Sequence, residues 1–308
     1  MNIQPSIFYS NGKLLLTGEY FVLDGALALA LPTKLGQSLQ VVDNEATAIN
    51  WTSYDADDSV WFEGKFSLPF GEYQSGTDQA TGERLTQIFQ AIQQQKSNFL
   101  QQFQGLQIET RLDFPRAWGL GTSSTLIANL ANWAKIDPFE LLKDTFGGSG
   151  YDIACANASG PILYQLEKRP TVLNRRTLFQ PFAKRLYFVY LGKKQDSRQG
   201  IAHYRQKVNN QPDLIFKISN LTQQFIDCQN LAEFESLILQ HETIVAETLE
   251  LPRAKDLYFS DYWGKIKSLG AWGGDFVLAT SYQSESETKF YFNERGFDTV
   301  VPFEKLIL

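Results

Sequence analysis

The sequence predicts an α+β protein of two domains, and three observations support this fold class. The chain has 308 residues, enough for a sizeable core and most naturally for two domains. Charged residues make up 20% and hydrophobic residues 43%, the balance of an ordinary globular protein. The patterns give a sheet with helices first, then helices with a closing sheet, which is typical of α+β domains. We place the boundary near Pro181, giving domains 1–181 and 182–308.

The N-terminal block predicts a sheet. Four short runs of residues common in strands follow one another, at 14–16, 20–23, 26–31 and 39–42. Asp24 and Gly25 form a typical hairpin turn signal between the second and third runs. Lys13 and Glu19 are charges within this apolar sequence, and the most frequent explanation is a pair of edge-strand charges facing water.

The remaining elements follow from hydrophobic periodicity. In the first domain we expect strands at 60–68, 106–112 and 161–166, and helices at 78–103, from the glycine loop to about 135, and at 138–146. In the second domain we expect strands at 186–191, 276–281, 289–292 and 299–302, and helices at 197–207, 213–228, 231–249 and 255–269.

Composition excludes several function classes. The net charge of −6 argues against broad binding to nucleic acid or to an anionic membrane. Cys155 and Cys228 form neither a disulfide framework nor a metal-ligand spacing, which favours a reducing compartment. The N-terminus has no signal-peptide pattern, and the apolar run 26–31 is far too short to cross a bilayer. We therefore expect a cytoplasmic protein that binds neither nucleic acid nor membrane.

Residues 114–125, FPRAWGLGTSST, combine a glycine loop with the start of a helix. Glycine lets the backbone approach a ligand closely, and the first N–H groups of a helix favour an anion, most usefully phosphate. The hydroxyls of Thr122, Ser123 and Ser124 add donors, and one could bind Mg²⁺. An ordinary helix N-cap is the alternative. No lysine follows Gly121, so this is not the P-loop of the common nucleotide-binding ATPases.

Two further glycine-rich segments carry an acid. Residues 147–154 read GGSGYDIA and present Asp152 before a run of small apolar residues. A surface turn would explain the glycines and the aspartate, but residues 153–156 are not typical of a surface loop. Asp152 is therefore a candidate catalytic carboxylate. Residues 270–275 read GAWGGD and form a third glycine-rich turn.

Three motifs in register resemble the GHMP kinases, the family of galactokinase, homoserine kinase, mevalonate kinase and phosphomevalonate kinase. Residues 10–25 are similar to the first motif of the family, residues 115–125 to its phosphate loop and residues 270–275 to its third motif. Their order and spacing agree over essentially the whole chain. Residues 18–24 and 149–154 look most like the branch of mevalonate kinase and phosphomevalonate kinase.

The resemblance implies an N-terminal mixed sheet with helices and a C-terminal ferredoxin-like α/β sandwich. It also implies an ATP-dependent kinase that phosphorylates mevalonate or phosphomevalonate for isoprenoid precursor synthesis, acting as a monomer or homodimer. Two alternatives stay open. One is a kinase of the same family for another small alcohol, sugar or amino acid. The other is a nucleotide-binding regulatory protein on the same scaffold.

The resemblance also implies roles for individual residues. Asp152 matches the presumed base of the family, and Lys13 would lie near it, keep it ionised and neutralise the transferring group. Ser123 would bind Mg²⁺. The residues implied for ATP are Trp118, Gly119, Leu120, Gly121, Thr122, Ser123 and Ser124. The residues implied for the substrate are Glu19, Gly150, Ser197, Arg198, Gly273 and Gly274.

The sequence departs from the family pattern at several of these motifs. Asn11 replaces the usual proline of the first motif, and Trp118 occupies a normally small position in the phosphate loop. Trp272 and Asp275 replace glycines of the third motif. A large indole and an extra negative charge beside polyphosphate would change how ATP or substrate fits. One of the two tryptophans could also stack on the adenine, or both could be core anchors.

Other polar residues have weaker claims to function. Lys193 and Lys194 could bind an acidic substrate, although a solvated basic loop is the more frequent case. His203 and His241 lie in expected helices with no acid partner in evident register. We interpret both histidines as surface or packing residues.

Overall fold

The computed structural model describes residues 4–166, 168, 170–173, 178–193, 197–207, 211–272 and 274–308. The chain forms two compact units, and neither is continuous in sequence. The first contains the residues up to Gly12, Leu35–Arg116 and Leu120–Asn157, and the second contains Lys13–Lys34, Ala117–Gly119 and Ala158–Leu308. The boundary that we expected near Pro181 therefore differs from the division that the structure shows.

The first unit contains a mixed sheet. Its own strands are β3 (Ala48–Tyr54), β4 (Val60–Ser67), β5 (Tyr73–Gly76) and β6 (Gly105–Leu112). They lie in the order β5-β4-β3-β6 and continue to β2 (Ala28–Asn44), which also pairs with β1 (Ser6–Thr17). The pair β3–β6 is parallel and the pairs β3–β4, β4–β5 and β2–β6 are antiparallel, so the expected mixed sheet is confirmed.

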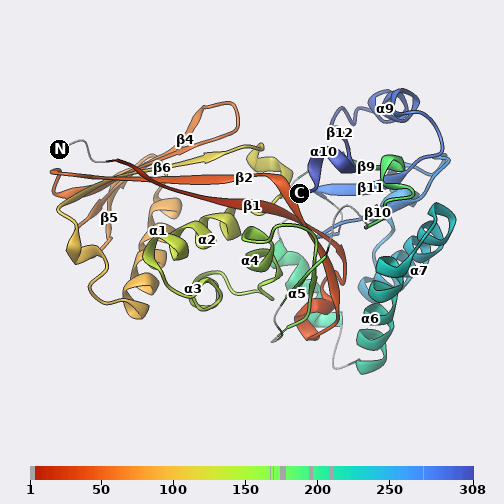
Figure 1. Ribbon diagram of the computed structural model, residues 1–308, viewed down its shortest axis with the longest axis horizontal. Coiled ribbons are helices and arrows are strands. Elements are labelled where there is room, and N and C mark those ends of the chain that lie inside the picture. Colours follow the sequence, from red (N-terminus) through yellow and green to blue (C-terminus); the bar gives the residue numbers. More distant parts are fainter. Residues whose placement is uncertain are drawn as a thin grey trace. The chain divides into compact units, whose positions relative to one another are not determined.

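Four helices cover one face of this sheet (Figure 1): α1 (Gln79–Gln95), α2 (Thr122–Ala134), α3 (Pro138–Thr145) and α4 (Tyr151–Ala156). Asp78 caps α1 by accepting the N–H of Thr81 at 2.7 Å. The helix ends at Gln95 and not at Phe103, because Lys96 leaves helical geometry at φ −145°. Phe99 and Leu100 are nevertheless buried, through the short 3₁₀ turn η2 (Leu100–Gln102). The apolar residues at 99 and 100 therefore reflect burial in the core and not a continuation of the helix.

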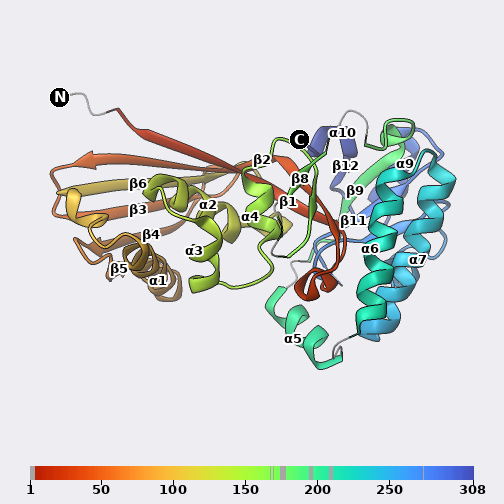
Figure 2. The same cartoon turned by 60° about the horizontal axis from the view of Figure 1, so that its bottom comes forward.

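The second unit contains a four-stranded antiparallel sheet in the order β10-β11-β9-β12, the strand order of the expected ferredoxin-like sandwich. These strands are β9 (Leu186–Tyr190), β10 (Ile266–Ser268), β11 (Phe276–Thr280) and β12 (Val300–Pro302). The helices α6 (Pro212–Asp227) and α7 (Leu231–Leu249) lie side by side, as Figure 2 shows. On the other face of the sheet, α8 (Ala254–Tyr258) and α9 (Glu285–Asn293) contribute to an aromatic core.

Smaller elements complete the second unit. They are α5 (Ser197–Lys207), α10 (Phe303–Leu306), η4 (Ala183–Arg185), β7 (Ile162–Tyr164) and β8 (Thr171–Val172). The first residues of β2 pair with β7, and β7 pairs with β8. The long strands β1 and β2 thus take part in both units.

The sequence predictions for the segments 20–23 and 255–269 were wrong. Residues 20–23 are not a strand: the 3₁₀ helix η1 (Phe21–Asp24) ends at Gly25, which has the left-handed φ of 88°. The segment 255–269 is not one helix, because α8 ends at Tyr258 and β10 begins at Ile266. A Cβ on Gly264 would lie 2.0 Å from the carbonyl oxygen of Thr280. The backbone at Gly264 therefore approaches the backbone at Thr280 closely, which a helix through Gly264 would not allow.

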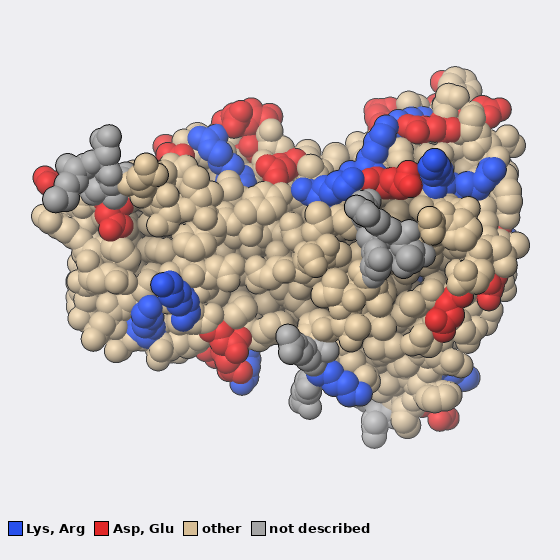
Figure 3. Space-filling model, viewed as in Figure 1, with Lys and Arg blue, Asp and Glu red and all other residues tan. Residues whose placement is uncertain are grey.

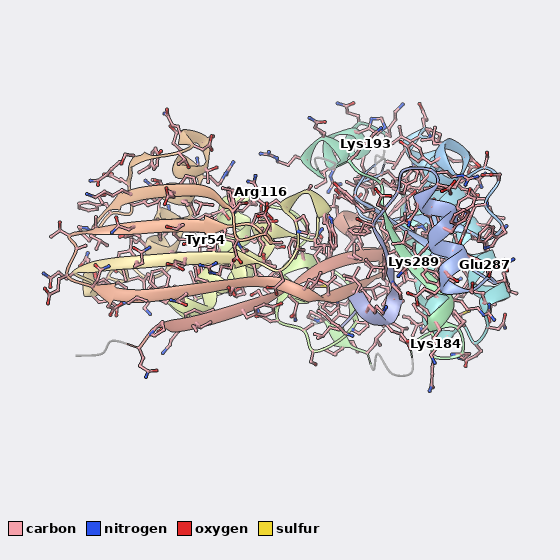
Figure 4. The ribbon with its side chains drawn as sticks, turned by 90° about the horizontal axis from the view of Figure 1, so that it is seen from above. Tyr54, Arg116, Lys184, Lys193, Glu287 and Lys289 are labelled. Atoms are coloured by element: carbon pink, nitrogen blue, oxygen red, sulfur yellow. The ribbon has the colours of Figure 1, made fainter. Side chains whose placement is uncertain are left out.

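Residues 289–292 were also predicted wrongly, as a strand. They lie in α9, and Figure 4 shows Lys289 and Glu287 on this helix. Ser284 and Glu287 form a capping box, in which each side chain accepts the backbone N–H of the other. This start signal outweighs the short apolar run Phe290–Phe292, which by itself fits a strand or a buried helix equally.

Charged side chains of both signs are spread over the face of the molecule that Figure 3 shows. Among the described residues, no helix combines the length and the apolar character needed to cross a bilayer.

Candidate functional site

The glycine loop has the backbone that the sequence predicted for an anion site. Gly119 and Gly121 have left-handed φ values of 67° and 97°, and no side chain caps the N-terminus of α2. Ser124 instead donates its hydroxyl to the carbonyl oxygen of Gly121 at 2.8 Å, and Thr125 donates to Gln37 Oε1 at 2.7 Å. These two hydroxyls are buried and hold the loop against the helix. The first N–H groups of a helix of 13 residues are therefore left to water or to a ligand.

The hydroxyls of Thr122 and Ser123 are more accessible than those of Ser124 and Thr125. Ser123 is exposed and Thr122 is half-buried, on the first turn of α2. Ser123 thus has a side chain that can reach a metal ion or a phosphate, as the resemblance implies. The side chain of Leu120 is fully buried and contributes packing, so only its backbone can contact a ligand.

Asp152 occupies the first turn of α4, which packs against α2 in the same unit. Three glycines with left-handed φ precede it: Gly147 at 68°, Gly148 at 107° and Gly150 at 85°, the last being the N-cap. The carboxylate is half-buried and accepts the N–H of Ile153 at 3.1 Å. The following residues are buried in the core, so Asp152 stands on a helix that is fixed by packing and not on a surface turn.

Lys13, Gly119 and Asp275 meet in the second unit. Lys13 Nζ donates to the carbonyl oxygen of Gly119 at 3.1 Å. The Asp275 carboxylate lies against the other side of Gly119, where a Cβ would stand 2.4–2.5 Å from its atoms. Any other residue at position 119 would therefore require the Asp275 carboxylate to move and would also have to adopt φ of 67°. Residues of all three sequence motifs are in contact at this point.

Asp275 is held in an unusual conformation. Its φ is 54°, and its N–H donates to the carbonyl oxygen of Lys193 at 2.6 Å while its own carbonyl accepts from Leu191 at 2.8 Å. The negative charge also acts on neighbouring phenols. Burial first and the Asp275 charge second raise the pKa of Tyr190, and Asp275 contributes to the raised pKa of Tyr20 after larger effects from burial and Glu19.

The two tryptophans of the motifs differ in their surroundings. Trp118 is half-buried and packs edge-on against Phe276, with ring centres 5.5 Å apart. Trp272 is 3% exposed, belongs to the core cluster around Tyr204, and donates its backbone N–H to Tyr20 Oη at 3.1 Å. Trp272 is thus a core anchor, whereas Trp118 keeps surface that a ligand can contact.

Glu19 is not an edge-strand charge facing water. It follows the end of β1 and is fully buried, with its Oε1 2.5 Å from Lys267 Nζ. Its Oε2 lies 3.2 Å from Nε2 of His241, which also accepts the N–H of Gly18. A direct substrate contact, which the resemblance implies for Glu19, conflicts with this burial. His241 is fully buried, as a packing residue would be, and its Nε2 accepts the N–H of Gly18 and does not donate to Glu19.

Glu242 completes this group, which we call the Lys267 cluster: Glu19, His241, Glu242 and Lys267. Glu242 Oε1 lies 3.7 Å from Lys267 Nζ, and the two carboxylate oxygens accept the N–H and the hydroxyl of Ser268, each at 3.0 Å. Burial raises the pKa of Glu242 to about 7, and it raises the pKa of Glu19. Burial also lowers the pKa of His241 well below its usual range. Removal from water thus disfavours charge on all three groups.

The other residues predicted for the substrate are spread more widely. Arg198 is exposed on α5, and Gly274 is buried in the turn between β10 and β11. Lys193 Nζ lies 5.8 Å from the centre of the Tyr258 ring, at the end of β9 (Figure 4). Gly273, Lys194 and the side chain of Ser197 lie outside the described residues. His203 is a packing residue, since its Nε2 contacts the carbonyl oxygen of Leu249 at 2.8 Å.

Sequence reasoning missed Lys267, Glu242 and two stacked arginines of the first unit. Arg116 lies over Trp61 with Cζ 4.3 Å from the ring centre, and Arg111 lies over Tyr54 at 3.6 Å. Figure 4 shows Tyr54 and Arg116 on the sheet face opposite the helices. Period-two alternation along the strands could have placed Arg111, Tyr54 and Trp61 on the outer face, but Arg116 follows the end of β6. No local signal pairs Lys267 with Glu19, because 248 positions separate them.

No family model matches the chain, and no curated protein matches it by sequence. Solved structures do resemble it. The mevalonate kinase of Methanococcus jannaschii has a TM-score of 0.70 at 16% identity, over 96% of each chain. The phosphomevalonate kinase of Streptococcus pneumoniae, solved with phosphomevalonate and AMPPNP, has a TM-score of 0.68 at 15% identity, over 96% of this chain and 99% of the other.

The galactokinase of Lactococcus lactis, solved with galactose, has a TM-score of 0.66 at 12% identity, over 95% of this chain and 89% of the other. At these identities the likeness concerns the fold. The α+β kinase fold implied by the three motifs is therefore confirmed.

Proposed function

We propose that this chain is an ATP-dependent kinase that transfers the γ-phosphoryl group to a hydroxyl of mevalonate or phosphomevalonate, in the synthesis of isoprenoid precursors. The observation that carries the proposal is the glycine loop. Its two left-handed glycines lead into a helix whose N-terminus has no side-chain cap. Such a loop fits polyphosphate, and it belongs to a fold that mevalonate kinase, phosphomevalonate kinase and galactokinase share.

The loop residues would hold the nucleotide. The N–H groups of Thr122, Ser123 and Ser124 would donate to the phosphates, and Gly119 and Gly121 would let the backbone approach them. Half-buried Trp118 would contact the nucleotide beside the loop. Mg²⁺, when bound with ATP, neutralises charge on the β- and γ-phosphates, and exposed Ser123 is the residue that we propose to bind it.

Asp152 would accept the proton of the attacking hydroxyl. Its place in the first turn of a packed helix gives the carboxylate a fixed position and leaves part of it accessible. Gly150 would let the substrate approach that turn, and Arg198 would bind an acidic group of the substrate. Lys13 already donates to Gly119 of the loop, so its ammonium is suited to neutralise the phosphoryl group in transfer.

A kinase for an uncharged alcohol or sugar is the second candidate function. The observation in its favour is the Asp275 carboxylate against Gly119, because a negative charge there repels an acceptor that carries its own phosphate. The galactokinase fold is also shared. The two candidates differ in the acceptor and not in the chemistry of transfer.

The test is ADP release by the purified chain with ATP and Mg²⁺, against mevalonate, phosphomevalonate, galactose and a panel of small alcohols. We expect turnover with one acceptor class and its loss in Asp152→Asn. Near-normal turnover in Asp152→Asn would count against Asp152 as the base. Nucleotide binding without turnover on any acceptor would favour the regulatory protein, and absence of nucleotide binding would refute both.

A further inference from the structure

The turn that carries Asp275 joins β10 to β11 within one hairpin. Ile266–Ser268 and Val277–Ala279 pair in antiparallel register, and Leu269 N–H donates to the carbonyl oxygen of Phe276 at 3.2 Å. Asp275 lies at the end of the turn, where its carboxylate contacts Gly119. Its N–H donates to the carbonyl oxygen of Lys193. The position of this turn therefore decides where the Asp275 carboxylate stands relative to the glycine loop.

The Lys267 cluster holds the base of this hairpin. Lys267 is in β10 and donates to Glu19 at 2.5 Å, so that the strand is bound to the first motif. Glu242, on α7, accepts both the N–H and the hydroxyl of the next residue, Ser268. Each side chain of the cluster is at most 2% exposed. Hydrogen bonds this well removed from water are strong, and solvent does not displace them.

A second contact holds the turn itself. Tyr20 Oη accepts the backbone N–H of Trp272 at 3.1 Å. Tyr20 has the left-handed φ of 61°, and its ring stacks on Tyr204, whose hydroxyl donates to Asp24 at 2.6 Å. Glu19 and Tyr20, adjacent in the first motif, thus bind the base and the turn of the same hairpin.

We infer that Lys267 and Glu242 are positioning residues, which act through the β10–β11 hairpin to hold Asp275 in place against Gly119 of the glycine loop. The inference deepens the proposed kinase function, because a correctly placed turn would preorganise the loop for nucleotide. Lys13, from the same motif as Glu19, donates to the carbonyl oxygen of the same Gly119. The side chains of Lys267 and Glu242 are both at most 2% exposed, so neither would touch the nucleotide itself.

A purely structural role is the competing explanation, since any broken buried ion pair lowers stability. Lys267→Met alone would leave two carboxylates buried without their cation. The double variant Glu19→Gln, Lys267→Met removes the closer ion pair as a whole and leaves only Glu242 without the cation. Phe292→Leu is the matched control: its side chain is fully buried in the same unit, in the aromatic core on the opposite face of the sheet.

The experiment compares wild type, the double variant, Glu242→Gln and Phe292→Leu by two measurements. Amide hydrogen exchange of the β10–β11 hairpin reports local opening without any ligand. Calorimetry with AMPPNP and Mg²⁺ reports nucleotide affinity. We expect hairpin exchange to be about tenfold faster or more in the double variant, and the Kd for AMPPNP to rise about 10- to 100-fold, as for other residues that support a site indirectly. Glu242→Gln keeps one acceptor for Ser268 and should give a smaller change in both.

Phe292→Leu should lower Tm while leaving hairpin exchange and Kd near those of wild type, after correction for global unfolding. Unchanged hairpin exchange in the double variant would overturn the inference. Faster exchange with an unchanged Kd would overturn it too, because the hairpin would then have no effect on the loop. If wild type binds no AMPPNP, the proposed function fails, and the exchange measurement alone decides whether the cluster holds the hairpin.

Discussion

Replacing Glu242 by glutamine removes a buried carboxyl whose pKa burial raises to about 7, from 4.5 in the unfolded chain. Between these two pH values the folded protein keeps the proton and the unfolded chain releases it. The folded state then binds more protons, so the free energy of unfolding falls as pH rises through this window. A difference of about 2.5 pKa units, at 1.36 kcal/mol each, corresponds to a loss of about 3 kcal/mol by pH 8.

Glutamine stays neutral and is free of this loss. We therefore expect the free energy of unfolding of Glu242→Gln, minus that of wild type, to rise by about 3 kcal/mol from pH 4.5 to pH 8. The neighbouring His241 acts in the opposite direction: its lowered pKa makes stability rise with pH up to about 6.5. Because wild type and variant share that histidine, its contribution largely cancels in the difference.

Urea unfolding followed by circular dichroism, at pH steps from 4.5 to 8, measures this difference. Glu247→Gln is the matched control, because Glu247 is exposed on the same helix as Glu242. The control should track wild type at every pH. A difference between Glu242→Gln and wild type that stays constant with pH, or that falls toward pH 8, would refute the reasoning.

Four further predictions concern the candidate site. Gly121→Val should weaken AMPPNP binding in calorimetry, because a β-branched residue disfavours φ near 97°; unchanged affinity of the folded variant would exclude the loop as the phosphate site. Asp152→Asn should lower kcat by about 10²–10⁴-fold with nucleotide affinity nearly unchanged, and a near-normal kcat would remove its catalytic role. Trp118→Phe should abolish a fluorescence response to nucleotide that Trp272→Phe retains, and the reverse result would contradict the burial of Trp272. Asp275→Asn, which keeps a residue tolerant of left-handed φ, should tighten binding of nucleotide about fivefold, or ~1 kcal/mol, and weaker binding would show that the carboxylate assists the nucleotide.

Much of the fold was readable from local patterns. Helix α7 has the bounds that its apolar spacing predicted, Leu231–Leu249, and Asp78 and Asp137 cap their helices as side chains of this type prefer. The glycine loop was readable too, because glycine at 119 and 121 signals positive φ before a helix begins. These features depend on residues within a few positions of one another.

The misread elements depend on distant residues. Strand β10 has three residues, all buried, and its place in the sheet comes from pairing with β11 and from α7. Glu19 looked like a solvent-facing charge because its cation, Lys267, lies 248 positions further along the chain. A charge in an apolar run is read as exposed unless the partner is known, and no local signal identifies that partner.

The discontinuous second unit also constrains how the chain can fold during synthesis. Glu19 leaves the ribosome early, but its buried partner Lys267 is made 248 residues later, which at 5–20 residues per second is roughly 12–50 seconds. Until then Glu19 has no Lys267 with which to form its buried ion pair. A fragment that starts at Ala158 would lack Glu19, so its buried Lys267 would lose the carboxylate at 2.5 Å and keep only Glu242 at 3.7 Å. Expression of the C-terminal part alone should therefore yield insoluble protein, and adding residues 13–34 as a separate peptide should rescue it.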